Sequence, residues 1–218
     1  MTTILMQPEP EESSGHSYPA ASPEFVTALP WPAELPTGLR HHLRVTRLID
    51  MDGVSHGLAD GTPIGRAPDQ DVHTFLEIVR ATARALDPRS QVRCAASSAT
   101  ATTHLDLLTA SRNNEWTIRR GLNGADQVLL DEMDELISTR RMATRWGTKA
   151  AAQPANLVIL AGQDHIYAPP VRQLRLMGIP TWLIVPGRIV AAPLYSCACA
   201  VSFLGPGTSC PFPSERSS

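Results

Sequence analysis

Three aspartates follow separate apolar runs of this 218-residue chain, and their chemistry is the most specific that the sequence offers. Asp50 ends one run, Asp126 follows a second after a short turn, and Asp164 comes directly after the run that ends at Ala161. Ionised carboxylates repel one another at close range, so a shared cation would supply the missing counter-charge. Oxygen ligands without ordered His or Cys favour Mg²⁺ or Mn²⁺ over zinc. Such an ion activates water and binds phosphate, which predicts phosphoryl-transfer chemistry.

Two further aspartates are candidates for the same cluster. Asp52 lies two residues after Asp50, and Asp131 lies a little over one helical turn after Asp126. An aspartate at a strand end or helix start also serves as a capping residue, so any one of them alone could be only a cap. Three acids at three matching strand ends favour a shared site.

The elements that must position these acids alternate between strand-like and helix-like patterns. Apolar strand runs are expected at 43–49, 91–96, 115–118, 156–161, 180–185 and 201–204, and helical periodicity at 71–86, 104–110, 124–137, 171–177 and 191–200. Such alternation predicts an α/β fold, a three-layer sandwich with a central, mostly parallel sheet and helices on both faces. The carboxyl ends of parallel strands share one edge, where sites form, so the three acids are expected to meet there.

The two ends of the chain differ from this core. Residues 1–40 are rich in Pro and Glu and lack apolar periodicity, which predicts a disordered leader, with 25–31 as the part that could dock on the domain. Residues 205–218 carry a cluster of Gly and Pro and are expected to be a disordered tail. The folded domain is predicted to span 41–204. The glycine-rich stretch 52–62 is expected to be a flexible loop, and it lacks the Lys-Ser/Thr ending of a nucleotide-binding P-loop.

Charge, hydrophobic content and cysteine usage exclude several classes of protein. The net charge of −2 argues against a strongly basic nucleic-acid binder, and 43% hydrophobic residues are enough for a core. No apolar run is long enough to span a membrane, and no secretory signal pattern opens the chain. Four cysteines are too few for a disulfide scaffold and have no metal-site spacing with the histidines. A cytoplasmic location without membrane association is therefore expected.

Basic and hydroxyl side chains near the acids are candidates for substrate contacts. Arg119 and Arg120 precede Asp126, and a guanidinium fork suits a phosphate group. Ser97 follows the second strand and could bind phosphate, although capping of the next helix is the favoured interpretation.

Two segments resemble the NYN domain family, a PIN-like nuclease group, and its bacterial members in particular. The stretch 117–131, with Gly124-Ala-Asp126 followed by Val-Leu-Leu, resembles the family's Gly-Ala-Asp-x-x-Leu-Leu segment. The stretch 160–168 resembles its Ser-Gly-Asp-x-x-Phe-Ala segment, and the opening 48–53 is similar to its first acidic motif. Together with the helix, Gly and strand of 174–187, the resemblance covers roughly 43–204.

The resemblance implies a PIN-like sheet and a Mg²⁺- or Mn²⁺-dependent endoribonuclease, in which a metal-activated water hydrolyses an RNA phosphodiester. It assigns Asp50, Asp126 and Asp164 as catalytic metal ligands, with Asp52 or Asp131 as additions. RNA is the implied partner, single-stranded or structured, together with a homodimer or a regulatory protein.

Two alternatives stay open. The family's Asn after the first acidic pair is Gly53 here, and Gly162-Gln163 stands before the third acid in place of Ser-Gly, which leaves a catalytically inactive RNA- or protein-binding module as one alternative. Asp50-Met-Asp-Gly-Val54 also resembles the opening motif of haloacid-dehalogenase phosphatases. In that family Asp50 would be the nucleophile and Asp52 the general acid.

Overall fold

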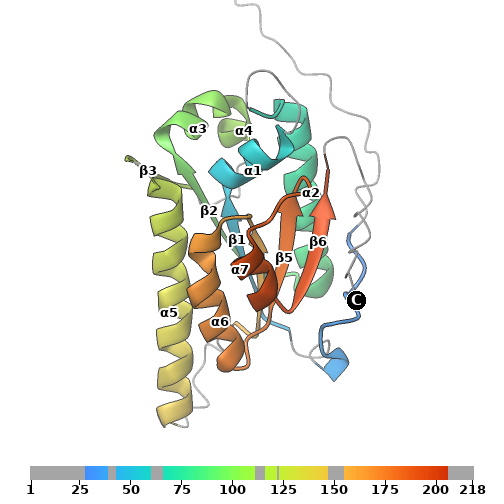
Figure 1. The fold of residues 1–218 in the computed structure, drawn as a ribbon, viewed down its shortest axis with the longest axis vertical. Helices are drawn as coiled ribbons and strands as arrows, with labels where there is room; N and C mark the ends of the chain where they lie inside the picture. The colour runs from blue at the N-terminus through green and yellow to red at the C-terminus, as the bar shows by residue number, and fades with distance from the viewer. Residues whose placement is uncertain are drawn as a thin grey trace, which may run out of the picture.

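A six-stranded sheet is the centre of the molecule, and every neighbouring pair of strands is parallel (Figure 1). The computed structural model describes residues 28–38, 43–59, 66–110, 116–121, 123–146 and 155–205. The strands are β1 Val45–Asp50, β2 Gln91–Ser97, β3 Trp116–Arg119, β4 Leu157–Ala161, β5 Thr181–Pro186 and β6 Ala200–Leu204. The helices are α1 Met51–Leu58, α2 Asp69–Leu86, α3 Ser98–Thr103, α4 Leu105–Ala110, α5 Gly124–Trp146, the 3₁₀ turn η2 His165–Tyr167, α6 Ala168–Leu176 and α7 Ala192–Cys197.

Two apolar layers cover the sheet, one on each face. On one face, α1 and α2 pack against the side chains of Val45 and Ile49 from β1. On the other face, α5, α6 and α7 pack against Leu48 of the same strand. Strands β1, β4 and β5 are buried along their whole length, as strands covered on both faces are. The predicted α/β architecture with helices on both faces is therefore confirmed, and the sheet is parallel throughout.

The strand order β3-β2-β1-β4-β5-β6 reverses direction at β1. The chain moves outward from β1 to β2 and β3, and then returns to place β4 on the other side of β1. In open parallel sheets, this reversal leaves a crevice outside the carboxyl ends of the two strands that flank it. Asp50 ends β1, and Asp164 follows β4 closely.

The glycine-rich stretch after β1 was expected to be a flexible loop, and this expectation was wrong for its described part. Residues 51–58 form α1, because Asp50 caps the helix and Val54 and Leu58 are buried in the core. Residues 60–65 lie outside the described structure. The short α3 was also not predicted, and the expected last helix ends at Cys197, so that Ala200 begins β6.

Part of the predicted leader packs on the domain. Within 28–38, Leu29 and Leu35 are buried, and the Leu29 N–H donates to Thr82 Oγ1 of α2 at 2.9 Å. This segment thus contributes to the core, whereas the sequence indicated a disordered stretch with docking only at 25–31. Residues 1–27, 39–42 and 206–218 lie outside the described residues, so the remaining predictions for the leader and the tail stay predictions. None of the helices within the described ranges is long and apolar enough to cross a membrane.

Candidate functional site

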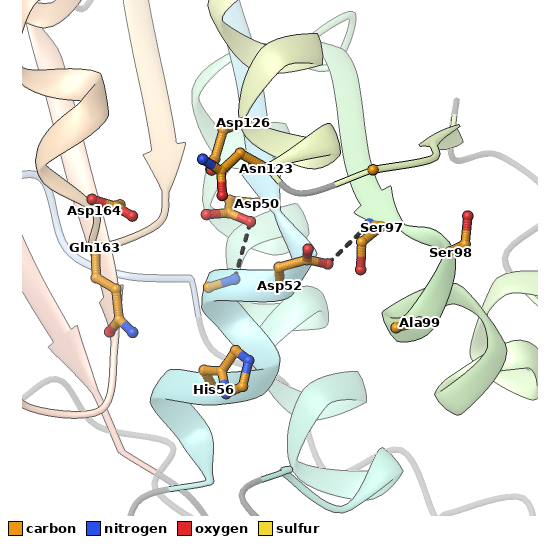
Figure 2. A pocket seen from close by; sticks show the side chains of 12 residues that line it. Asp50, Asp52, His56, Ser97, Ser98, Ala99, Asn123, Asp126, Gln163 and Asp164 are labelled. Atoms are coloured by element: carbon orange, nitrogen blue, oxygen red, sulfur yellow. Dashed lines mark hydrogen bonds between the residues drawn. The ribbon is translucent and has the colours of Figure 1, made fainter.

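A cavity of about 690 Å³ opens at the carboxyl ends of β1, β2 and β4 (Figure 2). Four aspartates line it, namely Asp50, Asp52, Asp126 and Asp164. The remaining lining residues are Gly53, His56, Ser97, Ser98, Ala99, Gly121, Asn123 and Gln163. The predicted acids of three strand ends are thus brought together at one edge of the sheet.

Asp50 is fixed by the start of α1. It is the N-cap residue, and its Oδ1 accepts a hydrogen bond from the Gly53 N–H at 3.0 Å. A Cβ atom at position 53 would lie 2.6 Å from Asp50 Oδ2, so a side chain there would displace the carboxylate. The glycine that departs from the family pattern therefore fits closely against Asp50.

Asp52 joins α1 to the end of β2. Its Oδ1 accepts the backbone N–H of Ser97 at 3.0 Å (Figure 2). Ser97 in turn caps α3, since its Oγ accepts the Thr100 N–H at 3.3 Å. The favoured capping interpretation of Ser97 is confirmed, and the residue lines the cavity as well.

Asp126 lies in the first turn of α5, after a tight turn that leaves β3. Asn123 adopts a left-handed conformation there, with φ of 59°. A Cβ atom at Gly124 would lie 2.3 Å from the Arg119 carbonyl oxygen, so only glycine allows this close approach. The buried Tyr167 hydroxyl donates to Asp126 Oδ1 at 2.6 Å.

Asp164 and Gln163 come from the loop after β4. Asp164 caps η2, where its Oδ1 accepts the Ile166 N–H at 3.3 Å, and it also contacts the ring of His165. Gln163 lines the cavity, and its Oε1 is buried without a hydrogen-bond partner in the described part of the chain. This amide therefore stands where the family pattern has a glycine.

Burial, together with the neighbouring carboxylates of Asp126 and Asp52, raises the pKa of Asp50 to about 7. The Gly53 N–H and a hydrogen bond with Tyr167 oppose this change. The carboxyl is only 2% exposed, so desolvation is the dominant cause. Near neutral pH the cavity therefore holds a carboxyl that is close to half protonated.

The pKa of Asp126 is also raised. Burial is the main cause, and the charges of Asp164 and Asp52 add to it, while the Tyr167 hydroxyl lowers it. Burial and the two carboxylates raise the pKa of Tyr167 itself, so this hydroxyl remains a hydrogen-bond donor. The three side chains of Asp50, Tyr167 and Asp126 form one coupled group.

No arginine or lysine from the described part of the chain lines the cavity. Within the described residues, His56 is the single basic side chain that lines it. Four carboxylates facing one histidine leave an excess of negative charge, which a bound cation would neutralise.

Carboxylate oxygens gather at the acidic end of the cavity, and such donors fit Mg²⁺ or Mn²⁺. The donors are the carboxylates of Asp50, Asp126 and Asp164. No three His, Cys, Asp or Glu side chains of the described chain are arranged as a ready-made group of metal ligands. Binding of one ion by several of these acids therefore requires their side chains to move from their present positions.

Three predicted residues lie outside the cavity. Asp131 pairs with Arg119, whose Nη1 is 3.2 Å from Asp131 Oδ2, and both side chains are exposed. The next residue, Arg120, is exposed and does not line the cavity. Asp131 lies more than one helical turn beyond Asp126, on the solvent side of α5, and therefore does not reach the cavity.

Two residues of the site were not predicted as functional. Tyr167 is a fully buried hydrogen-bond donor to Asp126. Gln163 was noted only as a departure from the family pattern. Their position in the loop after β4 beside Asp164 was a usable signal, since side chains of such loops line the crevice.

Comparison with protein-family models gave no match, and comparison with curated proteins gave none either. Among solved structures, the chain resembles a crystal structure of a protein of unknown function from Vibrio parahaemolyticus. The TM-score is 0.48 at 13% sequence identity, and the similarity covers 79% of this chain and 98% of that chain. Neither the fold described above nor the site rests on this distant similarity.

Proposed function

We propose that the protein is a divalent-cation-dependent endoribonuclease that hydrolyses RNA phosphodiesters, as the resemblance to NYN domains implies. The observation that carries the proposal is the convergence of Asp50, Asp126 and Asp164 from three strand ends on one cavity, which no arginine or lysine of the described segments lines. A phosphate group would be repelled by these acids unless a cation accompanied it.

The residues that would hold the ion are Asp50, Asp126 and Asp164, with Asp52 beside them. When bound, Mg²⁺ or Mn²⁺ lowers the pKa of a coordinated water and neutralises charge on the phosphate. The chain itself contributes the hydroxyl of Tyr167, which holds Asp126 Oδ1, and the ring of His56, whose N–H can donate to a phosphate oxygen at the cavity wall.

The strand order also occurs in dinucleotide-binding sheets, but the start of α1 argues against that use. In those proteins the backbone N–H groups of the first helix face a pyrophosphate, after a glycine-rich turn. Here the Asp50 carboxylate accepts the Gly53 N–H at that place. A negative side chain at the start of α1 would therefore repel a pyrophosphate.

A catalytically inactive binding module is the second candidate, and one observation favours it. Asp50, Asp52 and Asp164 each accept a backbone N–H, from Gly53, Ser97 and Ile166 respectively. Acids engaged in this way stabilise the loops of the cavity without any ion. In this alternative the same surface would bind RNA or protein and leave it intact.

Cleavage of labelled single-stranded RNA with and without Mn²⁺ tests the proposal, with Asp126→Asn as the decisive variant. Asn retains an oxygen that can accept the Tyr167 hydroxyl and remains acceptable in the first helical turn, so the variant should fold. We expect cleavage by the wild type only with Mn²⁺, and a loss of about 100-fold or more in the variant, as for removal of a group acting in the transition state.

Asp134→Asn is the matched control, because Asp134 lies on an exposed face of the same helix. It should cleave RNA like the wild type. Wild-type protein that binds RNA with or without Mn²⁺ and never cleaves it would establish the binding module instead. Release of phosphate from small monoesters with RNA left intact would support the phosphatase alternative.

A further inference from the structure

A buried arginine lies in the central strand of the sheet. Arg47 is the third residue of β1 and is only 6% exposed. Its Nη2 lies 3.5 Å from the Ser90 carbonyl oxygen, which is a long hydrogen bond, and its Nε has no hydrogen-bond partner in the described parts of the chain. Buried guanidinium groups are ordinarily paired, because an arginine cannot neutralise itself by losing a proton.

A second cavity, of about 360 Å³, lies at this arginine. It is formed by the end of α2, the α2–β2 turn and the start of β2, and its lining residues are Arg47, Arg84, Pro88, Ser90, Gln91, Val92 and Arg93. The Ser90 Oγ is also buried without a hydrogen-bond partner in the residues described. Two polar groups without a described partner therefore belong to residues of the same pocket. This pocket lies near the amino ends of β1 and β2, whereas the acidic cavity lies at their carboxyl ends.

The charge around this pocket is positive. Burial lowers the pKa of Arg47, and the guanidinium groups of Arg80 and Arg84 lower it further, so the three cations lie close together. Glu77 is the nearby carboxylate, and it pairs with Arg80 at 2.6 Å. Among the described charges that act on Arg47, arginines therefore outnumber carboxylates.

The next carboxylate along the chain does not balance the excess. Asp87 Oδ2 accepts the Val45 N–H at 3.0 Å, and its Oδ1 accepts the Arg89 N–H at 2.9 Å. Both oxygens therefore stabilise the α2–β2 turn. An anion in the pocket that Arg47 lines would supply a further counter-charge.

We infer that this pocket binds a phosphate group, either inorganic phosphate or a small phosphate ester. Arg47 and Arg84 would offer guanidinium donors, whose fork matches phosphate oxygens, and Ser90 would add a hydroxyl donor. The volume lies at the lower end of the usual range for small-molecule sites, roughly 300 to 1,000 Å³. This inference is independent of the proposed nuclease function, since the acidic cavity lies at the other edge of the sheet.

Isothermal titration of the full-length protein with inorganic phosphate, without divalent cations, tests the site. We expect saturable binding of one phosphate per chain and a rise in the thermal unfolding midpoint that sodium chloride of equal ionic strength does not produce. Phenyl phosphate is the second probe, and tighter binding of it than of inorganic phosphate would identify the ligand as an ester.

Arg84→Ala should weaken phosphate binding by about tenfold or more, because it removes a charged donor at an exposed position that the fold does not need. Arg89→Ala is the matched control, since Arg89 is an exposed arginine of the same turn that does not line the pocket. It should bind phosphate like the wild type. Arg47→Met should abolish binding and should fold, because replacing a buried charge with an apolar group is often tolerated.

Several results would overturn the inference. Equal stabilisation by chloride, or equal weakening in Arg89→Ala and Arg84→Ala, would show general screening by salt. Unchanged binding in Arg47→Met would place the phosphate elsewhere.

Discussion

The hydroxyl of Tyr167 lies 2.6 Å from Oδ1 of Asp126, and this hydrogen bond connects the loop after β4 to the first turn of α5. The two residues come from elements on opposite sides of β1, at the point where the strand order reverses. Because the tyrosine is fully buried, the bond fixes one wall of the acidic cavity.

Tyr167→Phe should destabilise the fold. The substitution removes the donor and leaves carboxylate oxygens of Asp126 and Asp50 less well satisfied, which costs about 1–3 kcal/mol of unfolding free energy. Urea denaturation measures the loss. Tyr195→Phe is the control, since Tyr195 is a partly exposed tyrosine that does not line the cavity, and equal losses in the two variants would contradict the role of this bond.

The stability of the protein should fall as the pH rises from about 4 to 7. The pKa of Asp50 is about 7 in the folded chain and 3.8 ordinarily, so folding takes up a proton in that window. Stability from this group is complete below pH 4 and is lost as the pH passes 7, at a cost on the order of 4 kcal/mol. Asp50→Asn should abolish this part of the dependence and stabilise the protein at pH 8.

The measurement is the free energy of unfolding of the two proteins across pH 4 to 8 without divalent cations. Asp134→Asn, at an exposed position, should follow the wild-type curve. A difference between wild type and Asp50→Asn that stays constant with pH would show that Asp50 titrates normally.

Mg²⁺ or Mn²⁺ should raise the thermal midpoint more at pH 8 than at pH 5.5. A cation competes with the proton on Asp50, and only the folded chain assembles the acids, so binding stabilises the native state by linkage. Differential scanning fluorimetry with EDTA as the reference measures the effect. No shift at millimolar concentrations of either metal at pH 8 would argue for the inactive binding module.

Asp131→Asn should leave RNA cleavage unchanged, in contrast to Asp126→Asn. Asp131 is exposed and paired with Arg119, and a surface pair of this kind contributes about 0–1 kcal/mol to stability. The resemblance suggested both acids, but only Asp126 lines the cavity. Comparing the cleavage rates of the two variants therefore tests whether an acid outside the cavity contributes to cleavage. A loss as large as that of Asp126→Asn would show that the helix must move to form the site.

Ser55, His104 and Asp69 have the hydrogen-bond order of a hydrolase triad but should be unreactive. The Ser55 Oγ lies 2.9 Å from His104 Nε2, and His104 Nδ1 lies 2.6 Å from Asp69 Oδ1. Ser55 is 4% exposed inside α1, so a substrate cannot reach it. A fluorophosphonate probe should not label it, and His104→Phe should destabilise the protein by about 1–3 kcal/mol, because Ser55 and Asp69 lose a partner.

The sequence was most informative about the aspartates at the carboxyl ends of the strands. Asp50, Asp126 and Asp164 were predicted to share one end of the sheet because parallel strands align their carboxyl ends, and all three line one cavity. The apolar run at 156–161 was recognisable as a strand buried on both faces. Periodicity alone supports such inferences, because it depends on local spacing.

Other features depend on contacts that are distant in the sequence. The stretch after Asp50 was predicted to be a loop because it is rich in glycine. It forms a helix instead, because burial of Val54 and Leu58 in the core stabilises one. The pocket at Arg47 could not be predicted from the sequence, because it forms only when α2 packs beside β1. Tertiary packing overrides local propensity at both places.

The position of β1 between β2 and β4 has a consequence for synthesis of the chain. β1 pairs with β2 over a short separation, but its other edge pairs with Leu157 and the residues after it, and the neighbouring Arg44 N–H bonds to Asn156 across 112 residues. During translation, β1 therefore has an open, apolar edge until β4 has left the ribosome. Such an edge can pair with other chains. A chaperone would therefore be needed most while the sheet consists of β1, β2 and β3 alone.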